Sequence, residues 1–147
     1  MHEIPPDLRA LLSEADLAEI AAHPIMLGED TERDAIDMAV GWAKHVAKID
    51  ADRDLPWADR SVWNEHDLAA ALHIRDFLER ALGGLTVPVR ERLAVWVAAV
   101  DEHFRSFTVD DPDGKMAKIA DVDLGGRAWW WRRVPIDGPI VRDLANY

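Results

Sequence analysis

The sequence predicts an all-α protein, a bundle of about four helices followed by a C-terminal β-hairpin or an irregular tryptophan-rich tail. Two observations support this fold class. Four segments repeat apolar residues at the spacing of an amphipathic helix, and after Thr108 the chain changes to turn-forming and β-favouring residues. The 147 residues suit one domain. We therefore expect a single domain over 1–147, with the bundle at about 11–107 and the tail at about 108–147.

The first two helices are expected at about 13–23 and 31–49. Ser13 suits the N-cap of the first helix because its hydroxyl can accept a hydrogen bond from the first turn, and Pro24 ends that helix. The second helix begins among acidic residues and ends near lysines, which is the polarity that the helix dipole favours. Its apolar stripe is Ile36, Val40, Ala43 and Ala47.

The third and fourth helices are expected at about 64–82 and 88–107. Gly83-Gly84 ends the third helix because glycine readily adopts the left-handed conformation of a helix C-terminus, and Pro88 suits the first turn of the fourth. The main stripe of the third helix is Leu68, Leu72, Arg75, Leu78 and Leu82. The fourth helix has the most regular stripe, which predicts a seam of the bundle: Leu93, Val97, Val100, Phe104 and Phe107.

The tail contains two short β-favouring runs, Ile119–Leu124 and Arg127–Val134, separated by Gly125-Gly126, which is typical of a β-hairpin. One face of this hairpin is expected to dock on the helices: Val122, Leu124, Trp129 and Trp131. The other face is expected to meet solvent or a partner: Asp121, Asp123, Trp130 and Arg132. Three consecutive tryptophans in an extended chain cannot all enter one core, because adjacent side chains point to opposite faces. The last residues, Val141–Tyr147, are expected to add a helical turn.

The composition is strongly acidic but also apolar. Asp and Glu outnumber Lys and Arg by 28 to 17, for a net charge of −11, while 49% of the residues are hydrophobic, unlike a disordered acidic tail. The charge favours solubility or a positively charged protein partner and disfavours binding to nucleic acid, whose phosphates would be repelled. The sequence contains no cysteine, no apolar run long enough for a membrane span and no signal-peptide pattern. We therefore expect a cytoplasmic protein that does not associate with membranes.

One pattern raises an enzymatic alternative. His66-Asp67, with His45 before it and Asp101 after it, matches the order of metal ligands in metal-dependent phosphohydrolases of the HD superfamily. Asp67 also has a structural explanation, because an acidic residue is favoured in the first turn of a helix. The sequence has neither a nucleophile elbow nor a phosphate-binding glycine loop. We therefore expect no catalytic residue, cofactor or bound metal, and keep an HD-type hydrolase as the alternative.

Acidic residues lie beside tryptophans in two places. At such a surface, charge accelerates the encounter with a basic partner, and an aromatic side chain anchors the contact. The alternative for either place is a solvated acidic loop whose tryptophans turn inward. The candidate partner-binding residues are Asp50, Asp52, Asp54, Trp57 and Asp59 in the first place, and Asp121, Asp123 and Trp130 in the second.

The stretches Asp101–Thr108 (DEHFRSFT) and Trp129–Pro135 (WWWRRVP), on a small acidic helical chain, resemble those of small bacterial immunity proteins. Proteins of that class neutralise a cognate toxin of interbacterial competition. The resemblance implies a non-catalytic protein that binds a basic toxin and blocks its active site. It implies no individual site residue, because immunity proteins have diverse folds. A third possibility is a non-enzymatic helical domain that binds a small ligand or forms oligomers.

Overall fold

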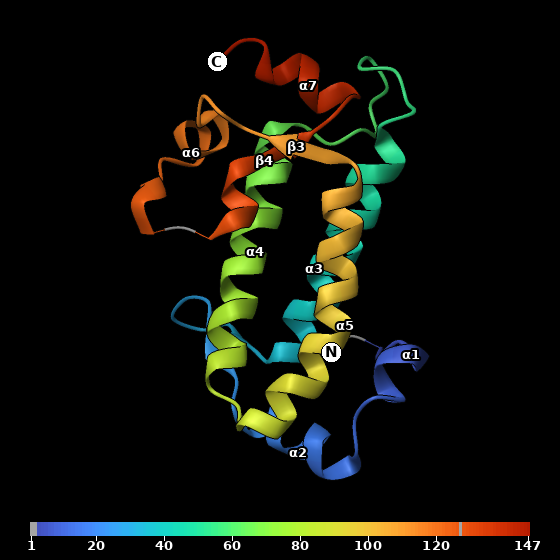
Figure 1. Cartoon of the computed structure of the whole chain (residues 1–147), viewed down its shortest axis with the longest axis vertical. Coiled ribbons are helices and arrows are strands. Elements are labelled where there is room, and N and C mark those ends of the chain that lie inside the picture. Colours follow the sequence, from blue (N-terminus) through green and yellow to red (C-terminus); the bar gives the residue numbers. More distant parts are fainter. Residues whose placement is uncertain (1–2, 127) are drawn as a thin grey trace. The chain divides into compact units, whose positions relative to one another are not determined.

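The computed structural model describes residues 3–126 and 128–147 and is mostly helical (Figure 1), so the predicted helical class is confirmed. Its helices are α1 (Pro6–Arg9), α2 (Glu14–Ala22), α3 (Ala35–Asp52), α4 (Glu65–Gly83), α5 (Val87–Ser106), α6 (Lys115–Ala120) and α7 (Pro139–Leu144). The shorter elements are the 3₁₀ turns η1 (Leu124–Gly126) and η2 (Trp129–Arg132) and the strands β1 (Ile25–Met26), β2 (Glu32–Arg33), β3 (Thr108–Asp110) and β4 (Arg133–Pro135). Within the described part of the chain, no helix combines the length and the apolar character needed to cross a membrane.

The four predicted helices correspond to α2, α3, α4 and α5. Ser13 is the N-cap of α2, because its Oγ accepts a hydrogen bond from the Asp16 backbone N–H while the Asp16 carboxylate accepts one from the Ser13 N–H, both at 3.0 Å. Helix α3 begins later than predicted, because Asp34 and Asp37 form the same reciprocal pair one residue before Ala35. The short helices α1 and α6 lie outside the predicted ones, so the structure contains more than four helices.

Residues up to Lys44 together with Ile74–Asp101 form one compact unit, here called unit 1. Within it β1 pairs antiparallel with β2. Most residues of the helical stripes that the sequence predicts are buried, but Ala43 and Val100 are half-buried and Ala47 is exposed. The apolar side chains of unit 1 that are shielded from solvent include Leu8, Ile20, Trp42, Leu78 and Leu93.

A buried ion pair lies inside unit 1. Arg75 donates from Nε and Nη2 to the two carboxylate oxygens of Asp101, at 3.0 Å each, and Trp42 Nε1 donates to the same carboxylate at 2.9 Å. Arg75 and Asp101 are 5% and 8% exposed. The predicted stripe of α4 thus includes a buried arginine, and burial is possible because its charge is paired and hydrogen-bonded.

His45–His73 and Glu102–Tyr147 form the second compact unit, unit 2. In unit 2, β3 pairs antiparallel with β4, with Val109 opposite Val134, and β4 contacts α7 (Figure 1). Helix α6 contacts the turn η2. The fully buried side chains of unit 2 include Leu68, Leu72, Phe104, Phe107, Met116 and Trp131.

The tail contains a two-stranded pair, as predicted, but β3 is formed by other residues, and β4 shares only Arg133 and Val134 with the expected second strand. The expected strand Ile119–Leu124 contains the end of α6 and the start of η1. Helix α6 is favoured because the Asp111 carboxylate accepts a hydrogen bond from the Met116 N–H at 3.0 Å, and it ends at Asp121, whose φ of 55° is incompatible with a strand. The expected second strand begins at Arg127, which lies outside the described residues, and most of the rest of it forms η2.

The three consecutive tryptophans lie in η2 and not in a strand. Successive side chains of a 3₁₀ turn are separated by about 120°, and they do not alternate between two faces. Trp130 and Trp131 are consequently both buried, at 4% and 0% exposure, and Trp131 meets the His73 ring edge-on with centroids 4.9 Å apart. The prediction that Trp130 faces solvent or a partner is therefore wrong. Trp129 stacks on an arginine, because its ring centroid lies 3.7 Å from Arg105 Cζ.

Candidate functional site

The first candidate cluster, residues 50–59, covers the end of α3 and the loop that follows it in unit 2. Asp52 has a structural role there. Its carboxylate is 5% exposed, pairs with Lys48 Nζ at 2.6 Å and accepts a hydrogen bond from the Trp63 N–H at 2.8 Å. Asp52 therefore attaches the loop to α3, and its carboxylate is not presented to a partner in this conformation.

Asp50 belongs to a chain of charged groups that ties α3 to the C-terminal segment of unit 2. Its carboxylate lies 2.8 Å from His103 Nε2 and 2.7 Å from Arg53 Nη1, and Arg53 Nε reaches Asp137 at 2.6 Å. Burial raises the pKa of Asp50, but the hydrogen bonds from His103 and Arg53 outweigh burial and hold this pKa below its ordinary value. Arg53 likewise lowers the pKa of Asp137 through their hydrogen bond.

Trp57 is the exposed aromatic residue of the cluster. Its side chain is 47% exposed, yet two residues of α7 hold it in place. The indole Nε1 donates a hydrogen bond to Asp143 at 2.7 Å, and the Arg142 guanidinium lies 4.1 Å from the ring centroid, which is a cation–π contact. The loop and α7 thus present a large aromatic side chain to solvent in one defined orientation.

Two further acidic residues of this cluster differ in how they are held. Asp54 is exposed, and within the described residues its carboxylate takes part in no hydrogen bond or ion pair. Asp59 accepts hydrogen bonds from the hydroxyl and the backbone N–H of Ser61, which lower the pKa of Asp59. Both charges lie on the same loop as Trp57, so this loop combines an aromatic side chain with the unpaired carboxylate of Asp54.

A groove of about 300 Å³ lies beside α7 on unit 2. Its apolar wall includes Val134 of β4 and Val141 and Leu144 of α7. Its acidic edge comes from the turn after β3, where the Asp110 side chain is 91% exposed and Asp113 is also exposed. Helix α7 therefore borders an acidic groove and also holds Trp57. We call Trp57, Asp54, α7 and this groove the α7 surface.

Sequence reasoning identified part of the α7 surface and missed the rest. It singled out Asp54 and Trp57, but it did not include α7 or the acidic turn after β3 in the site. The available signal was Gly138-Pro139 followed by apolar residues at helical spacing, which is typical of a short helix that begins at proline.

The second candidate cluster is divided by the structure. Asp121 and Asp123 are exposed, at the end of α6 and before η1, and the Asp123 carboxylate accepts a hydrogen bond from the Gly125 N–H at 2.9 Å. Trp130 is buried and cannot contact a partner in this conformation. The second cluster therefore offers exposed charge without an exposed aromatic anchor.

The residues of the hydrolase alternative have structural contacts of their own. Asp101 is bound by Arg75 and Trp42, the His45 ring lies 4.9 Å from the Trp63 ring, and Asp67 accepts a hydrogen bond from the Asn64 N–H at 2.9 Å. Across residues 3–126 and 128–147, no group of three or more histidine and acidic side chains is arranged to hold a metal ion. No observation therefore favours a catalytic metal centre.

Comparison of the chain with protein-family models, with curated proteins and with solved structures finds no match.

Proposed function

We propose that this chain is a non-catalytic binding protein that recognises a basic protein partner through the α7 surface. The observation that carries the proposal is the exposed side chain of Trp57, held between Asp143 and Arg142. An aromatic residue that is already ordered loses little conformational entropy on binding, and buried tryptophans dominate the affinity of many interfaces.

The exposed carboxylates of the α7 surface support a basic partner. Asp54, Asp110 and Asp113 are exposed on the same unit, and of these only Asp110 pairs with a described basic side chain, at 3.5 Å from Arg133. Lysine or arginine side chains of a partner would neutralise these carboxylates, while an apolar side chain between them would fill the groove beside Val141. Acid at the rim also accelerates association with a basic protein.

The particular partner we propose is a bacterial toxin, and the chain would then be its immunity protein. This step rests on the resemblance of the stretches 101–108 and 129–135 to immunity proteins together with the acidic α7 surface. A bound immunity protein would cover the toxin's active site, with its carboxylates in place of the phosphates of a nuclease substrate. Such a protein would act in the cytoplasm, where a toxin reaches its target.

The decisive experiment uses the product of the neighbouring gene, because immunity genes usually lie directly beside their toxin genes. That product is expressed in a bacterial host with and without this chain, and growth is recorded. The purified pair is then studied by calorimetry at low and at high salt. We expect growth to be restored, a Kd that rises with salt, and Trp57→Ala to weaken binding by about 2 kcal/mol, roughly 30-fold.

The matched control is Val95→Ala, which removes an exposed apolar side chain of α5 in unit 1 that does not belong to the α7 surface. This variant is expected to bind like the unmodified protein. Failure of the neighbouring product to bind would remove the toxin assignment. Binding to a basic partner that is insensitive both to salt and to Trp57→Ala would contradict the α7 surface itself.

A further inference from the structure

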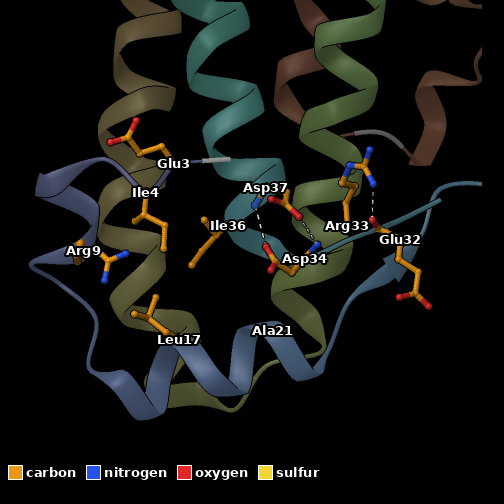
Figure 2. Close-up of a pocket in the computed structure, with 10 residues that line it drawn as sticks. All are labelled: Glu3, Ile4, Arg9, Leu17, Ala21, Glu32, Arg33, Asp34, Ile36 and Asp37. Atoms are coloured by element: carbon orange, nitrogen blue, oxygen red, sulfur yellow. Dashed lines mark hydrogen bonds between the residues drawn. The ribbon is translucent and has the colours of Figure 1, made fainter. Parts of the chain in front are cut away.

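A pocket of about 800 Å³ lies in unit 1, outside the α7 surface (Figure 2). It is bounded by the segment before α1, by α1 and α2, by β2 and by the first turn of α3. Its volume falls within the range of small-ligand sites, about 300–1,000 Å³, and exceeds what a single side chain would fill. The pocket is therefore large enough for a whole small molecule.

One part of the pocket is apolar. Figure 2 shows the side chains of Ile4, Leu17 and Ile36 pointing into the space between α2 and the start of α3. Ala21 of α2 also lines the pocket and adds little bulk. These side chains come from three separate segments, and together they form a surface that an aliphatic or aromatic group could cover.

The polar part of the pocket is mainly acidic. Its carboxylates belong to Glu3, Glu32, Asp34 and Asp37, against two guanidinium groups, those of Arg9 and Arg33. The chain around it has the same bias, because residues 1–44 contain ten Asp and Glu and three Lys and Arg.

The acidic side chains of the pocket differ in whether they already accept hydrogen bonds within the fold. One oxygen of Asp34 and one of Asp37 accept the backbone hydrogen bonds that begin α3 (Figure 2). The carboxylates of Glu3 and Glu32 are exposed and, among the described residues, make no hydrogen bond or ion pair. Arg33 directs one Nη to the Glu32 carbonyl at 2.7 Å and so leaves the Glu32 carboxylate uncompensated.

We propose that this pocket binds a small organic cation, with its apolar body against Ile4, Leu17 and Ile36 and its ammonium or guanidinium group beside the carboxylates. Charge complementarity selects this class, since the carboxylates outnumber the guanidinium groups two to one. The apolar surface adds a second requirement, because a fully hydrophilic cation would leave it uncovered. The proposal concerns unit 1 alone and does not rest on the proposed partner of the α7 surface.

Three probes of related shape separate the two requirements. The cation 4-phenylbutylammonium meets both of them, the anion 4-phenylbutyrate has the apolar body with the opposite charge, and putrescine is a cation with little apolar surface. Binding is measured by calorimetry on the full chain, and the site is located from amide chemical shifts. We expect saturable binding of 4-phenylbutylammonium with shifts at Leu17 and Ile36, and affinities for the other two probes that are at least tenfold lower.

Matched variants test the location. Ala21→Leu fills part of the pocket and is expected to raise the Kd of 4-phenylbutylammonium about tenfold. Its control is Ala18→Leu, at an exposed position of the same helix that does not line the pocket. Glu32→Gln is expected to raise that Kd about threefold, as removal of one partly solvated charge should, whereas Glu91→Gln on α5 should leave it unchanged.

Equal effects of Ala21→Leu and Ala18→Leu would overturn the location. Equal or tighter binding of 4-phenylbutyrate would overturn the charge assignment and indicate that the two arginines dominate the pocket. Absence of saturable 4-phenylbutylammonium binding up to about 10 mM, the range of a very weak complex, would overturn the proposal as a whole. None of these results bears on partner binding at the α7 surface.

Discussion

Arg75 and Asp101 form a two-point ion pair inside unit 1, with Nε and Nη2 of the arginine each 3.0 Å from a carboxylate oxygen. Trp42 completes the group by donating to Asp101 at 2.9 Å. All three side chains are buried. A buried pair of this kind contributes little net stability compared with apolar residues, but it is costly to break, because the remaining partner is left as an uncompensated charge.

Removal of the Arg75 charge should therefore destabilise the protein severely. We expect Arg75→Ala to lower the free energy of unfolding by about 3–5 kcal/mol in urea titrations. Glu79→Gln is the control, because Glu79 binds the outer side of the same guanidinium but is 57% exposed. That substitution should cost less than about 1 kcal/mol. Similar losses for the two variants would contradict the central role of Asp101.

The contact between Asp16 and Arg92 should make stability depend on acid pH. Arg92 donates to both carboxylate oxygens of Asp16 at 2.8 Å, and this, with help from the Ser13 N–H, lowers the pKa of Asp16 from 3.8 to about 2. Because the pKa is lower in the folded state, the stabilisation is complete well above pH 3.8 and is lost as the pH falls toward 2.

The measurement compares the unfolding free energies of the unmodified protein and Arg92→Gln across that range. Their difference should be constant from neutral pH to about pH 5 and should shrink steadily below it. A direct titration of the Asp16 carboxyl carbon by NMR should give a midpoint near 2 in the unmodified protein and a higher one in Arg92→Gln. A difference in stability that persists unchanged at pH 2 would contradict this account.

The cap of α2 offers a smaller, cleaner test. Ser13→Ala removes the acceptor for the Asp16 N–H, and we expect a loss of about 1 kcal/mol in the free energy of unfolding. Ser13→Gly should lower the free energy of unfolding by only a few tenths of a kcal/mol, since glycine at an N-cap leaves the backbone open to water. Equal losses in thermal or urea unfolding would show that the hydroxyl is not the important group.

Gly138 should be intolerant of any side chain. Its φ is +97°, and a Cβ placed there would lie 2.8 Å from the Cα of Arg53, which cannot move aside as a flexible side chain would. We expect Gly138→Ala to cost about 1–3 kcal/mol and to disturb α7, which begins at the next residue. The shift of α7 would appear as a changed fluorescence of Trp57. Gly28→Ala, where no atom lies within 4 Å of the new Cβ, should have little effect.

Two tryptophans of unit 2 should differ strongly in how much stability their truncation costs. Trp131 is fully buried, so Trp131→Ala should cost about 3–5 kcal/mol of unfolding free energy. Trp57 is half exposed, so Trp57→Ala should cost less than about 1.5 kcal/mol, the net value of its hydrogen bond. A severe loss of stability in Trp57→Ala would mean that this residue supports the fold, and its use as a binding anchor would then have to be abandoned.

The sequence indicates which residue types could form a binding surface, but not which of those residues are already engaged within the fold. It identified the acidic loop and Trp57, but it treated Asp50 and Asp52 as partner-binding groups, whereas both are engaged by basic side chains of the fold. It also placed Trp130 at the surface, whereas this side chain is buried in the structure. The pocket beside Leu17 has no sequence signature, because its walls come from segments that are separated along the chain.

The sequence by itself determined the long helices and most of their buried stripes. Helical hydrogen bonds and caps connect residues three or four positions apart, so the Ser13 cap and the Leu68–Leu72 spacing can be read locally. Only the tertiary structure decided the tail, the α7 surface and the pocket. Val109 pairs with Val134, and Trp57 with Asp143, across long stretches of chain. Such contacts form only when the fold of the intervening chain brings the two residues together, and local sequence patterns do not show this.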